Sequence, residues 1–206
     1  MTAYSLQVQN NSSGFTNFCV YQSPPDTNLG VRVETLAWFV EPAYPTTTVI
    51  FDWDVDYSFC WSEAGPLSPG VTFTASQVWA ADPLNPTLQA VQFHHYDHAY
   101  TFERLPANLN RHPGNLYIEQ GDDVPLREAS VGIGMSGSGT HAVEAQPNLH
   151  LIFTPHPRYW LVAGDFEYGE VLDMAEVSNA VEIDYYGAQT SKKLSYTMSN
   201  LFVPVP

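Results

Sequence analysis

The stretch VIFDWDVDYSFCWSE, residues 49–63, alternates large apolar residues with small or polar ones along its whole length. Side chains at every second position of a β-strand point to the same face, so this period of two indicates a strand with one face in a core. A strand over 47–62 is long for a globular protein, and we expect it to be bent or bulged. The apolar positions are Val49, Phe51, Trp53, Val55, Tyr57, Phe59 and Trp61.

The polar side of this stretch carries Asp52, Asp54 and Asp56, which raises the question of a metal site. Residues two apart on a strand are separated by about 6.6–7 Å, so the outer two aspartates lie roughly 13 Å apart, too far for one ion without a kink. An EF-hand calcium loop also begins with alternating aspartates, but it needs glycine at its sixth position, where this sequence has Tyr57. We therefore interpret the three aspartates as the solvent face of a sheet.

The rest of the chain shows the same alternation between frequent glycines and prolines. Only residues 168–179, YGEVLDMAEVSN, offer a short helix as a competing interpretation, and the longest expected loop is 104–114. Short strands separated by turns predict an all-β fold, an antiparallel two-sheet β-sandwich or flattened barrel, in a single domain over residues 1–206. The expected strands are 3–10, 15–22, 31–41, 47–62, 71–80, 87–94, 96–104, 115–119, 128–135, 140–145, 149–154, 159–163, 168–174, 180–187 and 194–203.

The composition is acidic, with 7 Lys and Arg against 22 Asp and Glu and a net charge of −15. Nucleic acids and anionic membranes attract basic clusters, so we expect neither as a partner. No apolar run is long enough to span a membrane, and the first residues, MTAYSLQVQNNSSG, lack the features of a signal peptide. We expect a cytoplasmic protein, with unconventional export as the alternative. Cys19 and Cys60 could pair, but a reducing cytosol favours two free buried thiols.

The stretch QFHHYDHAYTFE, residues 92–103, gathers three histidines within five positions. His95 and Asp97 have the spacing of a His-x-Asp pair on a strand, which is half of the facial triad that non-haem iron oxygenases use. His150, or else His156, could supply the second imidazole from another strand. The alternative, without metal binding, is that HHYDH forms a turn between two strands, because Asp favours turns.

The stretch ASVGIGMSGSGTHAV, residues 129–143, fits a glycine-rich phosphate loop only loosely. Such a loop needs a helix after it, and here another strand pattern follows. We interpret it as a glycine-rich hairpin between two strands.

Three segments, residues 8–25, 36–73 and 129–160, carry a further signal in combination: the LAWF strand, the PGV turn after a Trp-rich strand, the GIGMSGSGT hairpin and the TPHPRYW end. In this order they resemble the RhiA family, bacterial proteins named from a rhizosphere-expressed member. The resemblance implies a bacterial origin and a role in life near plants or in community behaviour. It carries over no activity, cofactor or catalytic residue, and it does not include the HHYDH cluster.

Three functions remain open from the sequence. Aromatic rings near Asp, Asn and Gln suit a neutral sugar or another small molecule, because rings stack on the ligand and polar groups orient it. The alternative is a metal-dependent enzyme, with iron, copper or zinc held by His95, Asp97 and His150. A second alternative is a self-assembling structural protein, since edge strands with few charges can pair with another copy. The expected binding residues of the first hypothesis, which needs no cofactor, are Trp79, Tyr96, Tyr100, Tyr159 and Trp160.

Overall fold

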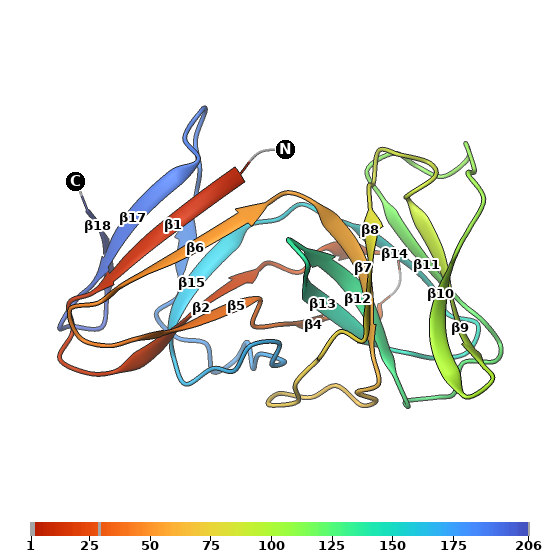
Figure 1. Cartoon of the computed structure of the whole chain (residues 1–206), viewed down its shortest axis with the longest axis horizontal. Helices are drawn as coiled ribbons and strands as arrows, with labels where there is room; N and C mark the ends of the chain where they lie inside the picture. The colour runs from red at the N-terminus through yellow and green to blue at the C-terminus, as the bar shows by residue number, and fades with distance from the viewer. Residues whose placement is uncertain (1–2, 29, 206) are drawn as a thin grey trace.

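The computed structural model describes residues 3–28 and 30–205, and in that part of the chain it contains strands and turns but no helix (Figure 1). The strands form four sheets. The first sheet has the order β18 (Phe202–Pro204), β17 (Ser191–Tyr196), β1 (Ala3–Asn10), β6 (Thr48–Asp54), and the second β16 (Val181–Ile183), β15 (Tyr159–Gly164), β2 (Thr16–Gln22), β5 (Phe39–Ala43). The third has the order β10 (Ala99–Arg104), β9 (Ala90–Tyr96), β11 (Leu116–Gln120), β14 (His150–Thr154), β3 (Asp26–Thr27), and the fourth β4 (Glu34–Thr35), β13 (Ser138–Glu144), β12 (Ser130–Met135), β7 (Tyr57–Ser62), β8 (Gln77–Ala81).

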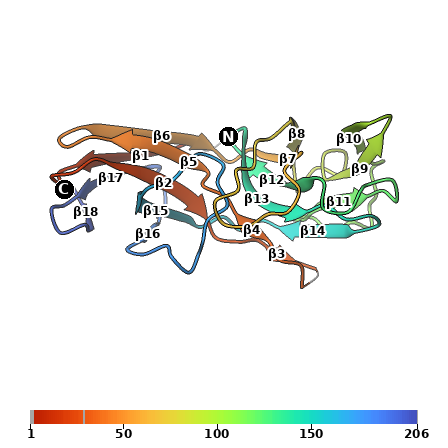
Figure 2. The ribbon, with the colours of Figure 1, turned by 90° about the horizontal axis from the view of Figure 1, so that it is seen from below.

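The four sheets pack in pairs, and each pair is a β-sandwich with its own core (Figure 2). The first and second sheets form the first sandwich, in which Phe51 and Leu161 share one core. The third and fourth sheets form the second sandwich, in which Phe93 and Val131 share another. The named strands pair antiparallel, except that β1 with β17 and β9 with β11 run parallel. The predicted all-β antiparallel class is therefore confirmed. Every sheet keeps open edges, so the flattened-barrel form is not adopted.

The chain crosses between the two sandwiches repeatedly. It passes from the first to the second between β2 and β3, returns between β4 and β5, crosses again between β6 and β7, and returns between β14 and β15. Neither sandwich is built from one continuous segment, which favours the expected single domain.

The expected bend in the stretch 47–62 is confirmed, and it divides the stretch between the two sandwiches. β6 belongs to the first and β7 to the second, with Val55 and Asp56 between them. On β6, Phe51 and Trp53 are buried while Asp52 is exposed, as the solvent-face interpretation predicts.

The β12–β13 hairpin locks this bend in place. Ser136 and Gly137 both have positive φ angles, 53° and 76°, and form the two-residue turn between Met135 and Ser138. Two positive φ angles define the type I′ turn that suits a tight hairpin. The amide of Ser136 donates to Asp56 Oδ1 at 2.9 Å, and the Ser136 hydroxyl accepts a hydrogen bond from the amide of Asp54 at 3.0 Å. The glycine-rich hairpin predicted from the sequence is therefore confirmed, and it joins the two halves of the bent strand.

Several strand predictions are wrong in their extent. The stretch 31–41 divides into β4 and β5, because it too passes from one sandwich to the other. The stretch 71–80 pairs only from Gln77, and before that Thr72 makes a single bridge to Glu170. The stretch 180–187 is reduced to β16, 194–203 contains two strands around a turn, and β3 falls between the expected strands 15–22 and 31–41.

Residues 168–174 form neither the expected strand nor the competing helix. Gly169 has a φ of +78°, which interrupts a regular strand or helix, and the segment makes only isolated bridges at Glu170 and Val171. Val171 packs against Leu67 and Phe73 from the segment that follows β7. These two segments together cover part of the outer face of the fourth sheet.

Cys19 and Cys60 are both free and buried, and they lie in different clusters of apolar side chains. Burial raises the pKa of the Cys60 thiol to about 12 and raises that of Cys19 further. Both thiols are therefore protonated and act as small apolar side chains. Within the part of the chain that the structure describes, no helix has the length and apolar character needed to cross a bilayer.

Two buried residues fill the junction between the sandwiches. Met135, at the hairpin tip, belongs to the core of the first sandwich, and its carbonyl accepts a hydrogen bond from Trp38 Nε1 at 2.9 Å. His141, on β13, is 2% exposed and lies with Nε2 3.3 Å from the carbonyl oxygen of Gln22 on β2. Burial lowers the pKa of His141 to about 4, so the imidazole is neutral at pH 7.

The first prediction concerns cooperativity. Calorimetry should show one unfolding transition, because the crossings and the hairpin make each sandwich depend on the other. Met135→Ala should lower the stability by about 2–5 kcal/mol, the usual cost of truncating a buried side chain, and shift the whole transition. Met198→Ala, at a residue that is 68% exposed, is the control and should leave it in place. Two separate transitions, with only one moved by Met135→Ala, would contradict the single-domain prediction.

The second prediction concerns acid stability. The unfolded imidazole takes up a proton near pH 6.5, whereas folded His141 resists protonation down to about 4. Protonation of this imidazole in the unfolded state therefore lowers the free energy of unfolding by roughly 3 kcal/mol as the pH falls from about 6.5 to 4. His141→Gln, which keeps a donor for Gln22, should flatten this part of the stability profile measured by urea unfolding. His112→Gln, at an exposed imidazole, should follow the wild type; equal slopes in all three proteins would show that His141 is not responsible.

Candidate functional site

The residues of the predicted metal triad do not come together. His95 follows the alternation of Val91 and Phe93 on β9, so it shares their core-facing side, and its ring lies 4.5 Å from that of Tyr100. His150, on β14, is exposed on the opposite face of the third sheet, because its neighbour Leu151 is the one in the core. β11 also separates β14 from β9. Among the residues described, no three His, Cys, Asp or Glu side chains form a group suited to a metal ion.

The HHYDH sequence forms a hairpin, which is the alternative considered from the sequence. Tyr96 pairs with Ala99, and Asp97 and His98 between them have φ angles of 50° and 63°. Asp97 is therefore a turn residue and not a strand residue beside His95. His94, on the outer face, has Nδ1 3.2 Å from Asp123 Oδ2.

The five predicted aromatic binding residues are dispersed. Tyr159 is buried in the first core, and Tyr100 packs between Trp61 and Phe93 in the second. Trp79 faces inward from β8, where the Arg104 guanidinium lies 5.2 Å from its ring.

The other two aromatics lie outside the cores. Tyr96 is 78% exposed beside the β9–β10 turn. Trp160 stacks on Tyr21 at 6.4 Å beside a shallow hollow, but its Nε1 already donates to the Ser23 hydroxyl at 2.9 Å. The five rings therefore do not make one binding surface.

The structure reveals instead an apolar cavity of about 660 Å³ on the outer face of the fourth sheet. We call it the outer cavity. It lies between β7, β8, the β6–β7 bend and residues 82–88, beside the part of the sheet that the later loops cover. This volume is within the range typical of small-molecule sites. Its apolar wall consists of Val55, Val78, Ala80, Pro83, Leu84 and Leu88.

Ser58 lies at the wall of the outer cavity, with its hydroxyl oxygen buried beneath the surface. The residue is 4% exposed, and its hydroxyl has no hydrogen-bond partner in the protein. Ser58 pairs with Gly134 on β12, where a β-carbon would lie only 2.7 Å from the Ser58 hydroxyl oxygen. Glycine at position 134 therefore leaves space for this hydroxyl. A buried polar group without a partner is costly, and such groups are rare in native proteins unless water or a ligand completes them.

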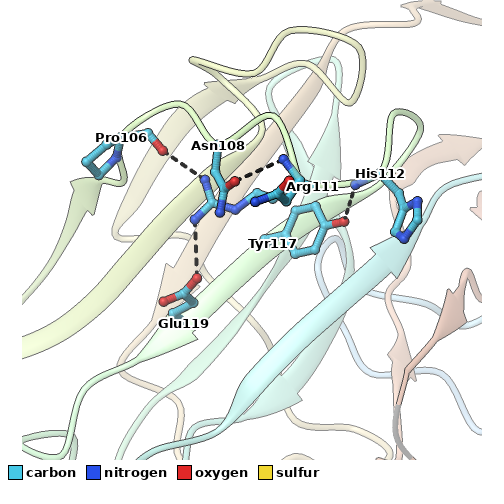
Figure 3. Close-up of polar contacts among 7 residues, drawn as sticks. Pro106, Asn108, Arg111, His112, Tyr117 and Glu119 are labelled. Carbon is cyan, nitrogen blue, oxygen red and sulfur yellow. Dashed lines mark hydrogen bonds and ion pairs between the residues drawn. The ribbon is translucent and has the colours of Figure 1, made fainter.

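The loop that includes Arg111 supports residues 82–88, which form one wall of the cavity. Arg111 Nη2 lies 3.3 Å from Glu119 Oε1, and Arg111 Nη1 donates to the carbonyl of Pro106 at 3.0 Å (Figure 3). The hydroxyl of Tyr117 accepts a hydrogen bond from the amide of His112 at 2.9 Å (Figure 3). These contacts order the long loop that the sequence predicts over 104–114.

The same loop holds the segment 82–88. The amide of Gly114 donates to the carbonyl of Pro83 at 2.8 Å, and Gln89 Nε2 donates to the carbonyls of both His112 and Pro83. Arg104 donates to the carbonyls of Ala80 and Leu88 from the core side of β8. These hydrogen bonds tie the cavity wall to the neighbouring loop and to Arg104.

Sequence analysis missed Ser58 and the outer cavity. Ser58 is one of several small polar residues that alternate with apolar ones, and nothing in that pattern distinguishes it from Ser62. The difference lies in the partners: Ser62 Oγ accepts a hydrogen bond from the amide of Ala64 at 3.2 Å, while Ser58 has none.

These features define a class: an all-β protein of two joined sandwiches, with an apolar cavity on the second sandwich beside the bend that joins them. The RhiA family model matches residues 1–203. Protein RhiA of Rhizobium leguminosarum bv. viciae is 35% identical over 191 residues, which cover 91% of this chain and 79% of that protein. The chain belongs to the RhiA family, as the resemblance of its motifs predicts. No solved structure matches the chain significantly.

The third prediction tests the unpaired hydroxyl. Ser58→Ala should raise the free energy of unfolding by about 1 kcal/mol, because it removes a buried polar group that has no partner. Ser62→Ala, on the same face of the same strand, should lower it, because it breaks the bond to Ala64. Urea unfolding of both variants measures the difference. If Ser58→Ala destabilises the protein as much as Ser62→Ala does, the Ser58 hydroxyl is bonded in solution and the site argument fails.

Proposed function

We propose that this protein binds a small, largely apolar molecule in the outer cavity. The observation that carries the proposal is the outer cavity itself, which has the volume of a small-molecule site, is lined mostly by apolar side chains, and has the unpartnered Ser58 hydroxyl buried beneath its wall. Small-molecule sites combine such a wall with a few polar groups that orient the ligand. The rigid support of residues 82–88 adds to this argument.

A small apolar molecule suits the outer cavity better than a neutral sugar does. A sugar needs polar partners for many hydroxyl groups, whereas the wall around Ser58 presents Val55, Val78, Leu84 and Leu88. The predicted aromatic residues are dispersed, so they give the sugar hypothesis no common stacking surface. In the same way, His95 and His150 lie on opposite faces of the third sheet, so this pair does not support the metal-enzyme alternative.

The fourth prediction tests binding with a neutral dye, N-phenyl-1-naphthylamine, which becomes fluorescent in apolar surroundings. The wild type should bind one dye molecule with saturation. Ala80→Trp should weaken binding by roughly tenfold or more, because a large side chain at this exposed wall position fills the cavity. Ala99→Trp, also exposed on a strand but in the third sheet, is the matched control and should bind as the wild type does. Absence of saturable binding, or an equal loss in both variants, would refute the proposed function.

A further inference from the structure

The only charged side chains among the described residues that line the outer cavity are two aspartates, Asp56 and Asp82. They lie at the same end of the β7–β8 ladder, because Tyr57 pairs with Ala81 and each aspartate is the next residue outward. Because side chains alternate between the two faces of a strand, Asp56 lies on the same face as Ser58, and Asp82 lies on the same face as Ala80. Both faces border the cavity, so the two carboxylates flank its mouth on the side of Ser58.

Neither carboxylate is neutralised by a basic side chain. Asp56 Oδ1 accepts the amide of Ser136, and Asp82 Oδ1 accepts the amide of Leu84 at 2.8 Å. The second carboxylate oxygen of each aspartate takes no part in these two contacts. Neither takes part in an ion pair among the described residues. The nearby Arg104 guanidinium lies on the core side of β8, over the rings of Trp79 and Phe59, and does not line the cavity.

The overall charge of the protein also suits a cation at this mouth. The net charge of −15 raises the local concentration of cations and repels anions over the whole surface.

We infer that the ligand of the outer cavity is an amphiphilic cation: an apolar body that lies along Val78 and Leu88, with a protonated amine between Asp56 and Asp82. The inference rests on the proposed function and adds the charge of the ligand to it. The two carboxylates line the cavity without a basic partner, and such a ligand supplies the counter-ion that they lack.

The experiment compares three probes with the same eight-carbon chain, namely octylamine, octanol and octanoate, as competitors of N-phenyl-1-naphthylamine at pH 7. Octylamine should displace the dye at a concentration about tenfold lower than octanol, and octanoate should be weaker than octanol. Added salt should reduce the advantage of octylamine, because the carboxylates lie at a solvent-facing mouth.

The variants assign this advantage to the two aspartates. Asp56→Asn combined with Asp82→Asn keeps the oxygen that accepts each backbone amide, so the turns should remain intact. Octylamine should then fall to the level of octanol, which is measured in the same variant and so corrects for any change in the binding of the dye. Asp122→Asn, at an exposed turn of the same sandwich, removes one charge away from the cavity and should leave the order of the probes unchanged.

The outcomes separate the two proposals. If the dye does not bind the wild type, the proposed function fails and the inference falls with it. If dye and octanol bind but octylamine has no advantage, the function stands and the cationic ligand is refuted. The cationic ligand is also refuted if the octylamine advantage persists in the double Asn variant, or if it does not respond to salt in the wild type.

Discussion

The fold depends on the contact between the tip of the β12–β13 hairpin and the bend that joins β6 to β7. The backbone amide of Ser136 donates a hydrogen bond to the Asp56 carboxylate, and the Ser136 hydroxyl accepts one from the amide of Asp54. The neighbouring residue, Met135, packs in the core of the first sandwich. A long strand that leaves one sheet and enters another exposes backbone groups at the bend, and these need partners. The hairpin supplies them, so one short turn determines how the two sandwiches meet.

The outer cavity is a consequence of the same contact. Val55 and Asp56 at the bend and Gly137 at the hairpin tip all line it, while Gly134 leaves space for the Ser58 hydroxyl. The later loops cover the outer face of the fourth sheet only in part, where Leu67, Phe73 and Val171 pack over Cys60. The remaining part is closed at the side by residues 82–88, which the loop around Arg111 fixes through Gly114 (Figure 3). A site on rigid elements is suited to binding with little rearrangement.

The candidate metal site shows why local spacing is a weak guide to a site in a β protein. His95 and Asp97 are two apart in the sequence, but a turn begins between them. His150 lies on the opposite face of the third sheet from His95, on a strand that is not adjacent to β9. A change of one residue in register exchanges the two faces of a strand, so the placement of a ligand group depends on register. The turn that places Asp97 at positive φ has Asp-His in place of the usual Asn-Gly or Asp-Gly, so the sequence carried no strong signal for it.

The sequence by itself determined the class of fold, the bend in 47–62, the glycine-rich hairpin and the family, because period-two alternation and turn residues are local properties of a chain. It also determined the acidic charge that favours cationic partners. Only the tertiary structure decided that the strands form two sandwiches, that 31–41 divides between them, and that residues 168–174 make only isolated bridges and lie over a sheet. It alone left Ser58 without a partner and placed Asp56 and Asp82 at the same end of the β7–β8 ladder. The physical reason is that burial and hydrogen-bond partners come from residues far apart in the sequence, and alternation fixes a face of a strand without fixing what covers it.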